Sequence, residues 1–260
     1  MKTIPNLLTL SNLFFGCIAI VFILQTGETL VMQNEEGTWL AQLPEKIWWG
    51  SACIGIAAVI DFLDGFVARW LNAESSLGKQ LDSLADTVSF GVAPSMILYQ
   101  LLRISYIQEE SALDTTLLAL IPAFVFACAG AYRLGRFNLE TVSSTGFRGV
   151  PIPAAGLVVA SLPLILVYNY YNINEVLLNK WFLYGIILML SWLMVSTLPM
   201  LAFKFKSAGA KQNLPVIILL VFSLIAFILL KWLAVPVIFI LYIVLSLVYK
   251  NKNYDLHRPG

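Results

Sequence analysis

Four aspartates lie in a strongly apolar part of the chain, where isolated charges are costly. Asp61 and Asp64 are three residues apart, and Asp82 and Asp86 are four residues apart. Either spacing places both members of a pair on one face of a helix. If the two faces meet, four carboxylates converge. They must then be protonated, paired with Arg or Lys, or neutralised by a metal ion.

The basic residues near these carboxylates are few, which favours metal binding. Arg69 and Lys79 are the ones close to them in sequence. Oxygen ligands suit hard cations such as Mg²⁺, Mn²⁺ or Ca²⁺, and two divalent ions would balance four negative charges. Gly65, Ala68 and Gly78 are small and leave room for a ligand or a neighbouring helix. The set predicts a polar recess for a metal-chelated phosphate compound, with Arg69 and Lys79 at its mouth.

The elements that carry these residues are predicted to be membrane helices. Of the 260 residues, 59% are hydrophobic and 12% are charged, whereas a soluble domain carries about 25% charged residues. A spanning helix needs about 20 mostly apolar residues. By that measure the chain is all-α, a polytopic integral membrane protein with about eight transmembrane helices. The predicted spans are 7–25, 47–71, 78–102, 115–137, 151–170, 181–203, 213–230 and 232–249.

The placement of Lys and Arg predicts the orientation, because cytoplasmic loops carry an excess of both. With the N-terminus in the cytoplasm, twelve basic residues lie inside and four outside. The C-terminus and the four aspartates then belong to the cytoplasmic side. Length and short loops suggest a bacterial inner membrane. The outer residues are Lys46, Arg103, Lys180 and Lys231; the inner ones are Lys2, Arg69, Lys79, Arg133, Arg136, Arg148, Lys204, Lys206, Lys211, Lys250, Lys252 and Arg258.

Composition argues against several other classes of site. The net charge of +1 gives no reason to expect a nucleic-acid partner. The three cysteines lie far apart with no CxxC spacing, so neither a disulfide framework nor a zinc site is expected. An ion-coupled transporter remains an alternative, because intramembrane carboxylates also form ion relays. The chain shows no internal repeat, and Arg69 and Lys79 beside the acidic residues favour a phosphate ligand.

The acidic, small and basic residues form one spaced pattern that resembles the signature of the CDP-alcohol phosphatidyltransferases. It reads Asp61-x2-Asp64-Gly65-x2-Ala68-Arg69-x8-Gly78-x3-Asp82-x3-Asp86. The resemblance covers roughly residues 1–200, and the stretch 4–9 (IPNLLT) looks like the family's entry to its first helix. It implies a six-helix core at 1–203, followed at 204–260 by a two-helix extension and a polar tail.

The resemblance also implies a chemistry. In that family a CDP-linked lipid gives its phosphatidyl group to an alcohol and releases CMP, assisted by two divalent ions, here expected to be Mg²⁺ or Mn²⁺. Asp61, Asp64, Asp82 and Asp86 would bind metal, and Asp86 would also act as base on the incoming hydroxyl. A homodimer is suggested on the same ground. The implied CDP-binding residues are Asn6, Thr9, Gly65, Ala68, Arg69, Gly78 and Lys79.

Three further segments resemble one branch of the family, the membrane-type phosphatidylserine synthases. They are 9–16 (TLSNLFFG), 131–138 (AYRLGRFN) and 146–155 (GFRGVPIPAA). Guanidinium groups bind carboxylates in a bidentate manner. Arg133 and Arg136, together with Asn12, are therefore the predicted acceptor-binding residues. The implied partners are CDP-diacylglycerol, L-serine and membrane lipid, and the implied products are phosphatidylserine and CMP.

Alternatives remain open for these acceptor residues. The acceptor could be glycerol 3-phosphate, inositol phosphate or another alcohol, because the aspartate pattern is common to the whole family. Arg133 and Arg136 could be positive-inside anchors. Asn12 could form a hydrogen bond to a neighbouring helix in place of a ligand.

Overall fold

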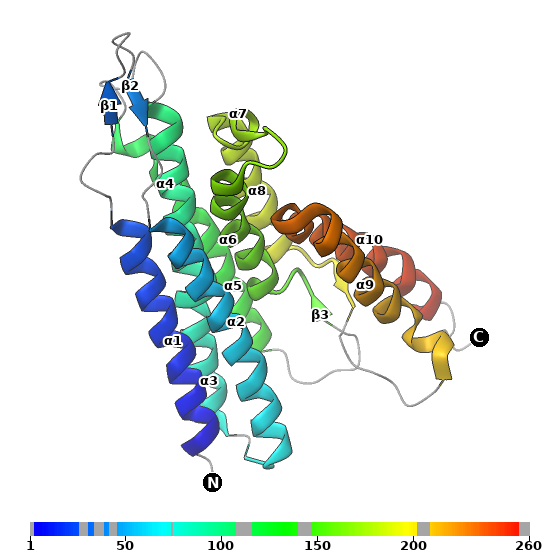
Figure 1. Ribbon diagram of the computed structural model, residues 1–260. Coiled ribbons are helices and arrows are strands. Elements are labelled where there is room, and N and C mark those ends of the chain that lie inside the picture. Colours follow the sequence, from blue (N-terminus) through cyan, green and yellow to red (C-terminus); the bar gives the residue numbers. More distant parts are fainter. Residues whose placement is uncertain are drawn as a thin grey trace.

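The computed structural model describes residues 3–25, 31–33, 39–41, 46–73, 75–107, 116–139, 147–201 and 209–254, and within these the chain is almost entirely helical (Figure 1). The prediction of an all-α polytopic membrane protein is confirmed. The longer helices are α1 (Thr3–Leu24), α2 (Ile47–Trp70), α3 (Ser76–Asp86), α4 (Ala93–Ile107), α5 (Val125–Leu139), α6 (Ile152–Tyr168), α8 (Lys180–Val195), α9 (Gly209–Leu230) and α10 (Ala234–Tyr254). The shorter elements are β1 (Val31–Gln33), β2 (Trp39–Ala41), η1 (Thr87–Val92), η3 (Leu117–Ala119), η4 (Ile121–Phe124), β3 (Phe147–Arg148), α7 (Asn174–Leu177), β4 (Pro199–Met200) and η5 (Lys231–Leu233).

The helical segments correspond to the predicted spans. In the part of the chain described, five are long and apolar enough to cross a membrane: Ile4–Leu24, Ile47–Trp70, Ser76–Ile107, Leu117–Leu139 and Leu214–Tyr249. Two shorter apolar helices, Ile152–Tyr168 and Lys180–Val195, cover the remaining predicted spans. The segment Leu214–Tyr249 includes most of α9 and most of α10, and the chain reverses between these two helices at Lys231, where φ is 51°. The predicted domain boundary at residues 203 and 204 lies outside the described residues.

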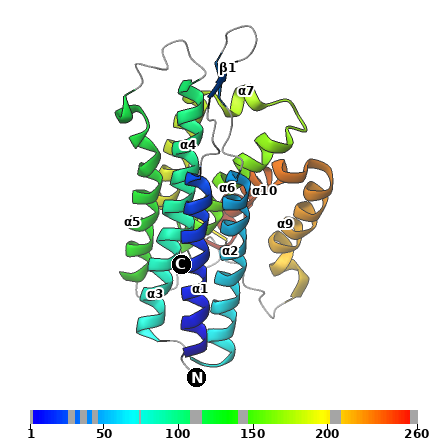
Figure 2. The same ribbon diagram turned by 60° about the vertical axis from the view of Figure 1, so that its left-hand side comes forward.

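The first helices form a bundle with a common lower end. In Figure 1 the start of α1, the turn between α2 and α3, and the last residues of α5 lie toward that end, whereas β1, β2 and α7 lie at the opposite one. A second view shows α1 beside both α2 and α3 (Figure 2). α1 therefore stands next to both of the helices that carry the aspartates.

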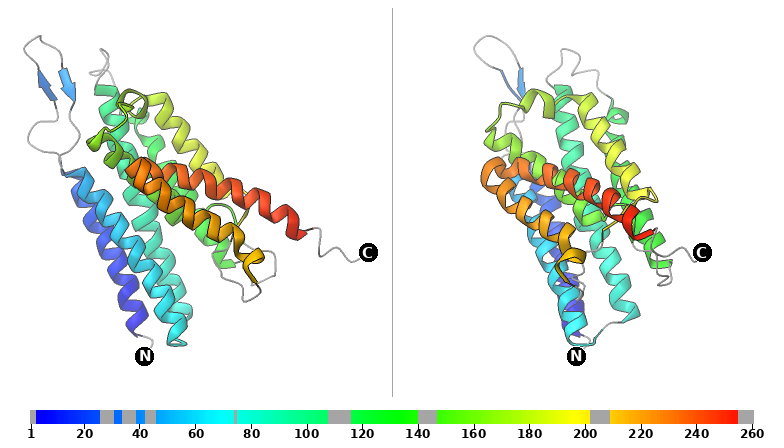
Figure 3. Two further views of the ribbon diagram at one scale, coloured as in Figure 1. Left: turned by 45° about the vertical axis from the view of Figure 1, so that its right-hand side comes forward. Right: turned by 90° about the vertical axis from the view of Figure 1, so that its right-hand side faces the viewer.

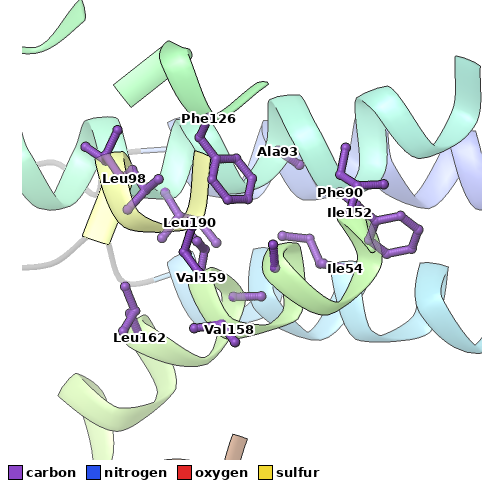
Figure 4. Packing of buried hydrophobic residues seen from close by; sticks show 14 of the residues in the cluster. Ile54, Phe90, Ala93, Leu98, Phe126, Ile152, Val158, Val159, Leu162 and Leu190 are labelled. Carbon is purple, nitrogen blue, oxygen red and sulfur yellow. The ribbon is translucent and has the colours of Figure 1, made fainter. Parts of the chain in front are cut away.

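The core is centred on α6, whose side chains are buried along most of its length. Figure 4 shows Val158, Val159 and Leu162 among residues from α2, α4, α5 and α8. Glycines allow this close packing: a Cβ on Gly156 would lie 2.9 Å from the carbonyl oxygen of Phe90 in η1. η1 therefore packs against both α6 and α1.

β3 and β4 pair beside the end of α8 and place the start of α6. Gly149 follows β3 with φ of 73°, a value that favours glycine. A Cβ there would lie 2.5 Å from the Met194 carbonyl oxygen, so a side chain is excluded on two grounds. The Gly149 amide donates to Leu198 O at 2.8 Å, and the Val150 amide donates to Leu193 O at 3.1 Å.

The α9–α10 hairpin leans across the bundle, with its two helices side by side (Figure 3). Its turn is fastened to the segment after α6. The Lys231 ammonium lies 3.5 Å from the centroid of the Tyr170 ring, a favourable cation–π contact. The Tyr171 hydroxyl donates to Leu229 O at 3.0 Å.

The other end of the hairpin is fastened to the residue after β4. The Leu201 amide donates to Ser246 Oγ at 3.1 Å, and the Tyr242 hydroxyl donates to Leu201 O at 3.1 Å. Both α10 side chains are buried. The C-terminal pair of helices is therefore attached to the core at both ends.

Candidate active site

The turn between α2 and α3 is closed by local hydrogen bonds. The Ala73 amide donates to Ala68 O at 2.9 Å, and Asn72 adopts a left-handed conformation with φ of 46°. Ser75 then caps α3, accepting a hydrogen bond from the Gly78 amide at 3.0 Å, as serine does at many helix N-termini. This compact turn sends the two acidic helices back into the bundle together.

The structure brings the four aspartates together. Carboxylate oxygens of Asp61, Asp64 and Asp82 all lie within 4.8 Å of one another, and Asp86 lies beside Asp61 and Asp82. Asp64 is 5% exposed and Asp86 is 6% exposed. Asp61 and Asp82 are partly exposed, so the cluster has a buried side and an accessible side.

This donor set fits a hard divalent cation. Oxygen ligands lie about 2.3–2.6 Å from Ca²⁺ and about 2.0–2.1 Å from Mg²⁺, so two ligands on one ion are at most about 5 Å or about 4 Å apart. The three carboxylate oxygens, all within 4.8 Å of one another, satisfy the wider limit, and a small inward movement of the side chains would bring them onto a smaller ion. Buried charges of one sign also need neutralisation, which a cation supplies.

α1 contributes hydrogen-bond donors to two of the carboxylates. The Thr9 hydroxyl lies 2.7 Å from Asp64 Oδ2, and Asn12 Nδ2 donates to Asp86 Oδ1 at 3.3 Å. Thr9 and Asn12 are both buried. Asn12 therefore does form a hydrogen bond to a neighbouring helix, which was the alternative to a ligand contact, and its partner is an aspartate of the cluster.

The small residues of the pattern are contacted by polar side chains. A Cβ on Gly65 would lie 3.4 Å from Arg69 Nη1, so the guanidinium lies over this glycine one helical turn away. A Cβ on Gly78 would lie 3.1 Å from Asn6 Oδ1, which brings the start of α1 to the start of α3. Ala68 is partly buried, and it lies on α2 between Gly65 and the turn that leads to α3.

Lys79 and Arg133 lie near the same aromatic ring. The Lys79 ammonium is 5.6 Å from the centroid of Phe137, and the Arg133 guanidinium carbon is 5.5 Å from it. Arg133 is 6% exposed, whereas Lys79 is exposed. Phe137 therefore contacts one basic side chain from α3 and one from α5.

The guanidinium of Arg136 contacts the end of α8. It donates to Val195 O at 2.8 Å and to Ser196 O at 3.0 Å, and it also contacts Arg148 O at 3.5 Å. A cation suits the carbonyl-rich end of a helix. The predicted role of Arg136 in acceptor binding stays a prediction, while the structure shows it joining α5 to α8 and β3.

Comparison with known proteins then decides the family. A family model described as CDP-alcohol phosphatidyltransferase matches residues 2–195, a stretch that includes the whole aspartate cluster. The chain belongs to the CDP-alcohol phosphatidyltransferase family. As a phosphatidyltransferase it is an enzyme, which decides against the transporter alternative.

Several curated members of the family are similar to this one. The chain is 35% identical over 222 residues to the CDP-diacylglycerol–serine O-phosphatidyltransferase of Helicobacter pylori strain J99, covering 85% of this chain and 79% of the relative. It is 34% identical over 186 residues to the enzyme of that name from Bacillus subtilis, covering 69% and 89%. An archaetidylserine synthase of Methanothermobacter thermautotrophicus is 34% identical over 123 residues, covering 46% and 48%.

Two features of this candidate site in the phosphatidyltransferase were not anticipated from the sequence. Asn138 Nδ2 donates to Ser83 Oγ at 2.7 Å, which ties α5 to α3 beside Asp82. Asn138 belongs to the segment AYRLGRFN noted in the sequence, but its hydrogen bond to α3 was not predicted. A π-helix, η1, follows Asp86 directly. No signal in the hydrophobic pattern distinguishes that turn from ordinary α-helix.

Proposed function

We propose that this protein transfers the phosphatidyl group of CDP-diacylglycerol to the hydroxyl of L-serine, giving phosphatidylserine and CMP. The observation that supports the proposal is the close approach of the four aspartate side chains in a member of this family. The choice of serine is supported by the relatives, since each of the three described above is named for serine transfer or for a serine lipid.

The aspartates have distinct proposed roles. Asp61, Asp64 and Asp82 would hold a divalent cation, and Asp86 would contribute to a second one, with Mg²⁺ or Mn²⁺ as the candidates. Bound cations would neutralise the diphosphate and stabilise charge on the leaving phosphate. The close approach of the carboxylate oxygens supports these roles.

CDP is proposed to lie over the small residues at the accessible side of the cluster. Gly65, Ala68 and Gly78 leave the backbone of α2 and α3 open to the nucleotide. Arg69 and Lys79 are the proposed ligands for phosphate oxygens, and the position of Arg69 over Gly65 and the exposure of Lys79 support this role. Asn6 and Thr9 complete the site from α1.

Asp86 is the proposed general base. It accepts the proton of the serine hydroxyl while the serine oxygen forms a bond to the phosphorus of the phosphatidyl group. The bond from that phosphorus to the bridging oxygen of the diphosphate breaks, and CMP leaves with that oxygen. A serine hydroxyl is a weak nucleophile at neutral pH, so a positioned base is needed. The burial of Asp86 supports this role because water is kept from competing.

Arg133 is the proposed ligand for the serine carboxylate. It is buried, and it shares the Phe137 ring with Lys79 of α3, so it belongs to the same face of the bundle as the aspartates. Arg136 is proposed as a second acceptor-binding residue, and its contact with the end of α8 fixes the position of its guanidinium. The reaction is proposed to occur at the cytoplasmic face of a bacterial inner membrane, with both termini on that side, in a homodimer.

An acceptor panel tests the function. Detergent-solubilised protein is incubated with CDP-diacylglycerol, Mn²⁺ or Mg²⁺ and, in separate reactions, serine, glycerol 3-phosphate, inositol phosphate, choline or ethanolamine. CMP release and the lipid product are measured. Phosphatidylserine formation that requires the metal is the expected result. Faster turnover of any other alcohol than of serine would show that the acceptor is misassigned.

A further inference from the structure

We infer that Asn12 is a positioning residue that orients Asp86, and that α1 is the element on which the acidic helices are aligned. The inference depends on the proposed role of Asp86 as base. It concerns a contact between the first helix and the catalytic group, and it gives Asn12 a task other than binding the acceptor.

Three residues on one face of α1 contact three different parts of the site. Thr9, Asn12 and Gly16 are separated by three and four residues, which places them in one row along the helix. Thr9 reaches Asp64 on α2 and Asn12 reaches Asp86 at the end of α3. One rigid helix therefore sets the relative positions of two carboxylates that come from two other helices.

The Asn12 amide is suited to orienting a base. Asn12 is fully buried, and its Nδ2 donates to Asp86 Oδ1 at 3.3 Å. The bond fixes the rotation of the carboxylate and adds no positive charge that would compete with a metal ion. Hydrogen bonds in surroundings of low dielectric constant are stronger than in water. The amide occupies only one lone pair of Oδ1, so the other lone pairs of the carboxylate are left for the proposed cation and for the acceptor proton.

The position of Asn12 is itself fixed by η1. Ser89, three residues after Asp86, donates through Oγ to the backbone carbonyl of Asn12 at 3.0 Å. One turn further along α1, a Cβ on Gly16 would lie 2.3 Å from Ser89 Oγ, so the glycine is what lets the two helices approach this closely. π-Turns occur often at functional sites. Here the π-turn directs Ser89 at the carbonyl of the residue whose side chain holds Asp86.

The side-chain oxygen of Asn12, Oδ1, distinguishes a role in binding the acceptor from a role in orienting Asp86. Asn12 Oδ1 is buried and makes no hydrogen bond within the part of the protein that the structure describes. If Asn12 bound the acceptor, this oxygen would take a donor from serine, and its loss would raise the KM for serine. If Asn12 orients Asp86, its loss lowers kcat and leaves both KM values nearly unchanged.

The test compares Asn12→Leu and Asn12→Ser with wild type in the metal-dependent CMP-release assay. Leucine has similar volume but no donor to Asp86. We expect Asn12→Leu to lower kcat by about 10- to 100-fold, with KM values and Mn²⁺-dependent CDP-diacylglycerol binding changed by no more than about twofold. Serine keeps an O–H donor, so Asn12→Ser should retain more activity than Asn12→Leu.

Gln100→Leu is the matched control. Gln100 of α4 is also a buried amide that donates to α1, through Nε2 to Ile23 O at 3.1 Å, but its acceptor is a backbone carbonyl of α1 and not an aspartate. It should keep wild-type kcat. An unchanged kcat in Asn12→Leu, a rise in serine KM alone, or an equal loss in Gln100→Leu would each overturn the inference. If wild type does not use serine, the proposed function fails separately. The comparison is then made with the alcohol that supports CMP release.

Discussion

Gly16→Ala is the sharpest test of how closely α1 must approach η1. The new Cβ would lie 2.3 Å from Ser89 Oγ and 2.9 Å from Ser89 Cα. Non-bonded atoms prefer about 3.5–4.0 Å, so one helix must move by about 1 Å. The same movement would stretch the contact between Asn12 Nδ2 and Asp86 Oδ1 from 3.3 Å to beyond hydrogen-bonding range.

Two magnitudes follow from that displacement. Overpacking costs about 1–3 kcal/mol, and the helix propensity of alanine over glycine returns about 1 kcal/mol. The net loss of stability is therefore about 0–2 kcal/mol, and the protein should still fold. Activity should fall much further, because a misplacement of about 1 Å at a catalytic group can lower the rate about 100-fold.

The assay pairs thermal unfolding in detergent with metal-dependent CMP release. Gly55→Ala on α2 is the control, because a Cβ at that glycine meets no atom within 4 Å. It should keep both stability and rate. If Gly16→Ala is folded and retains kcat within about twofold of wild type, the close approach of α1 to η1 does not set the geometry of Asp86.

Four further substitutions separate the proposed roles. Asp86→Asn should lower kcat by about 100- to 10,000-fold while CDP-diacylglycerol binding persists through the other aspartates; a near-native rate would remove Asp86 as the base. Asp64→Asn should weaken Mn²⁺ and CDP-diacylglycerol binding together in equilibrium titrations, and loss of only one would contradict shared ligation. Arg133→Ala should raise the KM for serine more than that for CDP-diacylglycerol, whereas equal changes would indicate a shared phosphate role. Arg136→Ala should lower stability by about 1–3 kcal/mol in thermal unfolding, since a charged donor to the end of α8 is lost; an unchanged unfolding temperature would refute this structural role.

The helices and the aspartate cluster could be predicted from local features of the sequence. Long apolar runs define spanning helices because the bilayer requires internal hydrogen bonding. The spacing of Asp61 with Asp64, and of Asp82 with Asp86, defines which side chains share a face. Both arguments use neighbours within a few residues, and the structure agrees with them.

The contacts made by α1 and by Arg136 could not be predicted in this way. Asn12 and its partner Asp86 are 74 residues apart in sequence, and Arg136 and Val195 are 59 residues apart. A guanidinium that binds a carboxylate ligand and one that binds the end of a helix look alike in a motif. Only the packing of α5 against α8 shows which carbonyls Arg136 meets.

The attachment of α10 to Leu201 has a consequence for biosynthesis. α9 and α10 enter the membrane after the helices that precede them, so the amide and carbonyl of Leu201 lack these partners until Ser246 and Tyr242 of α10 have been synthesised. Unsatisfied backbone groups are costly in and near a bilayer. A product of a premature stop codon before α9 would leave both groups exposed. Such a product should therefore be less stable than the chain with α9 and α10, even though it contains every residue of the aspartate cluster.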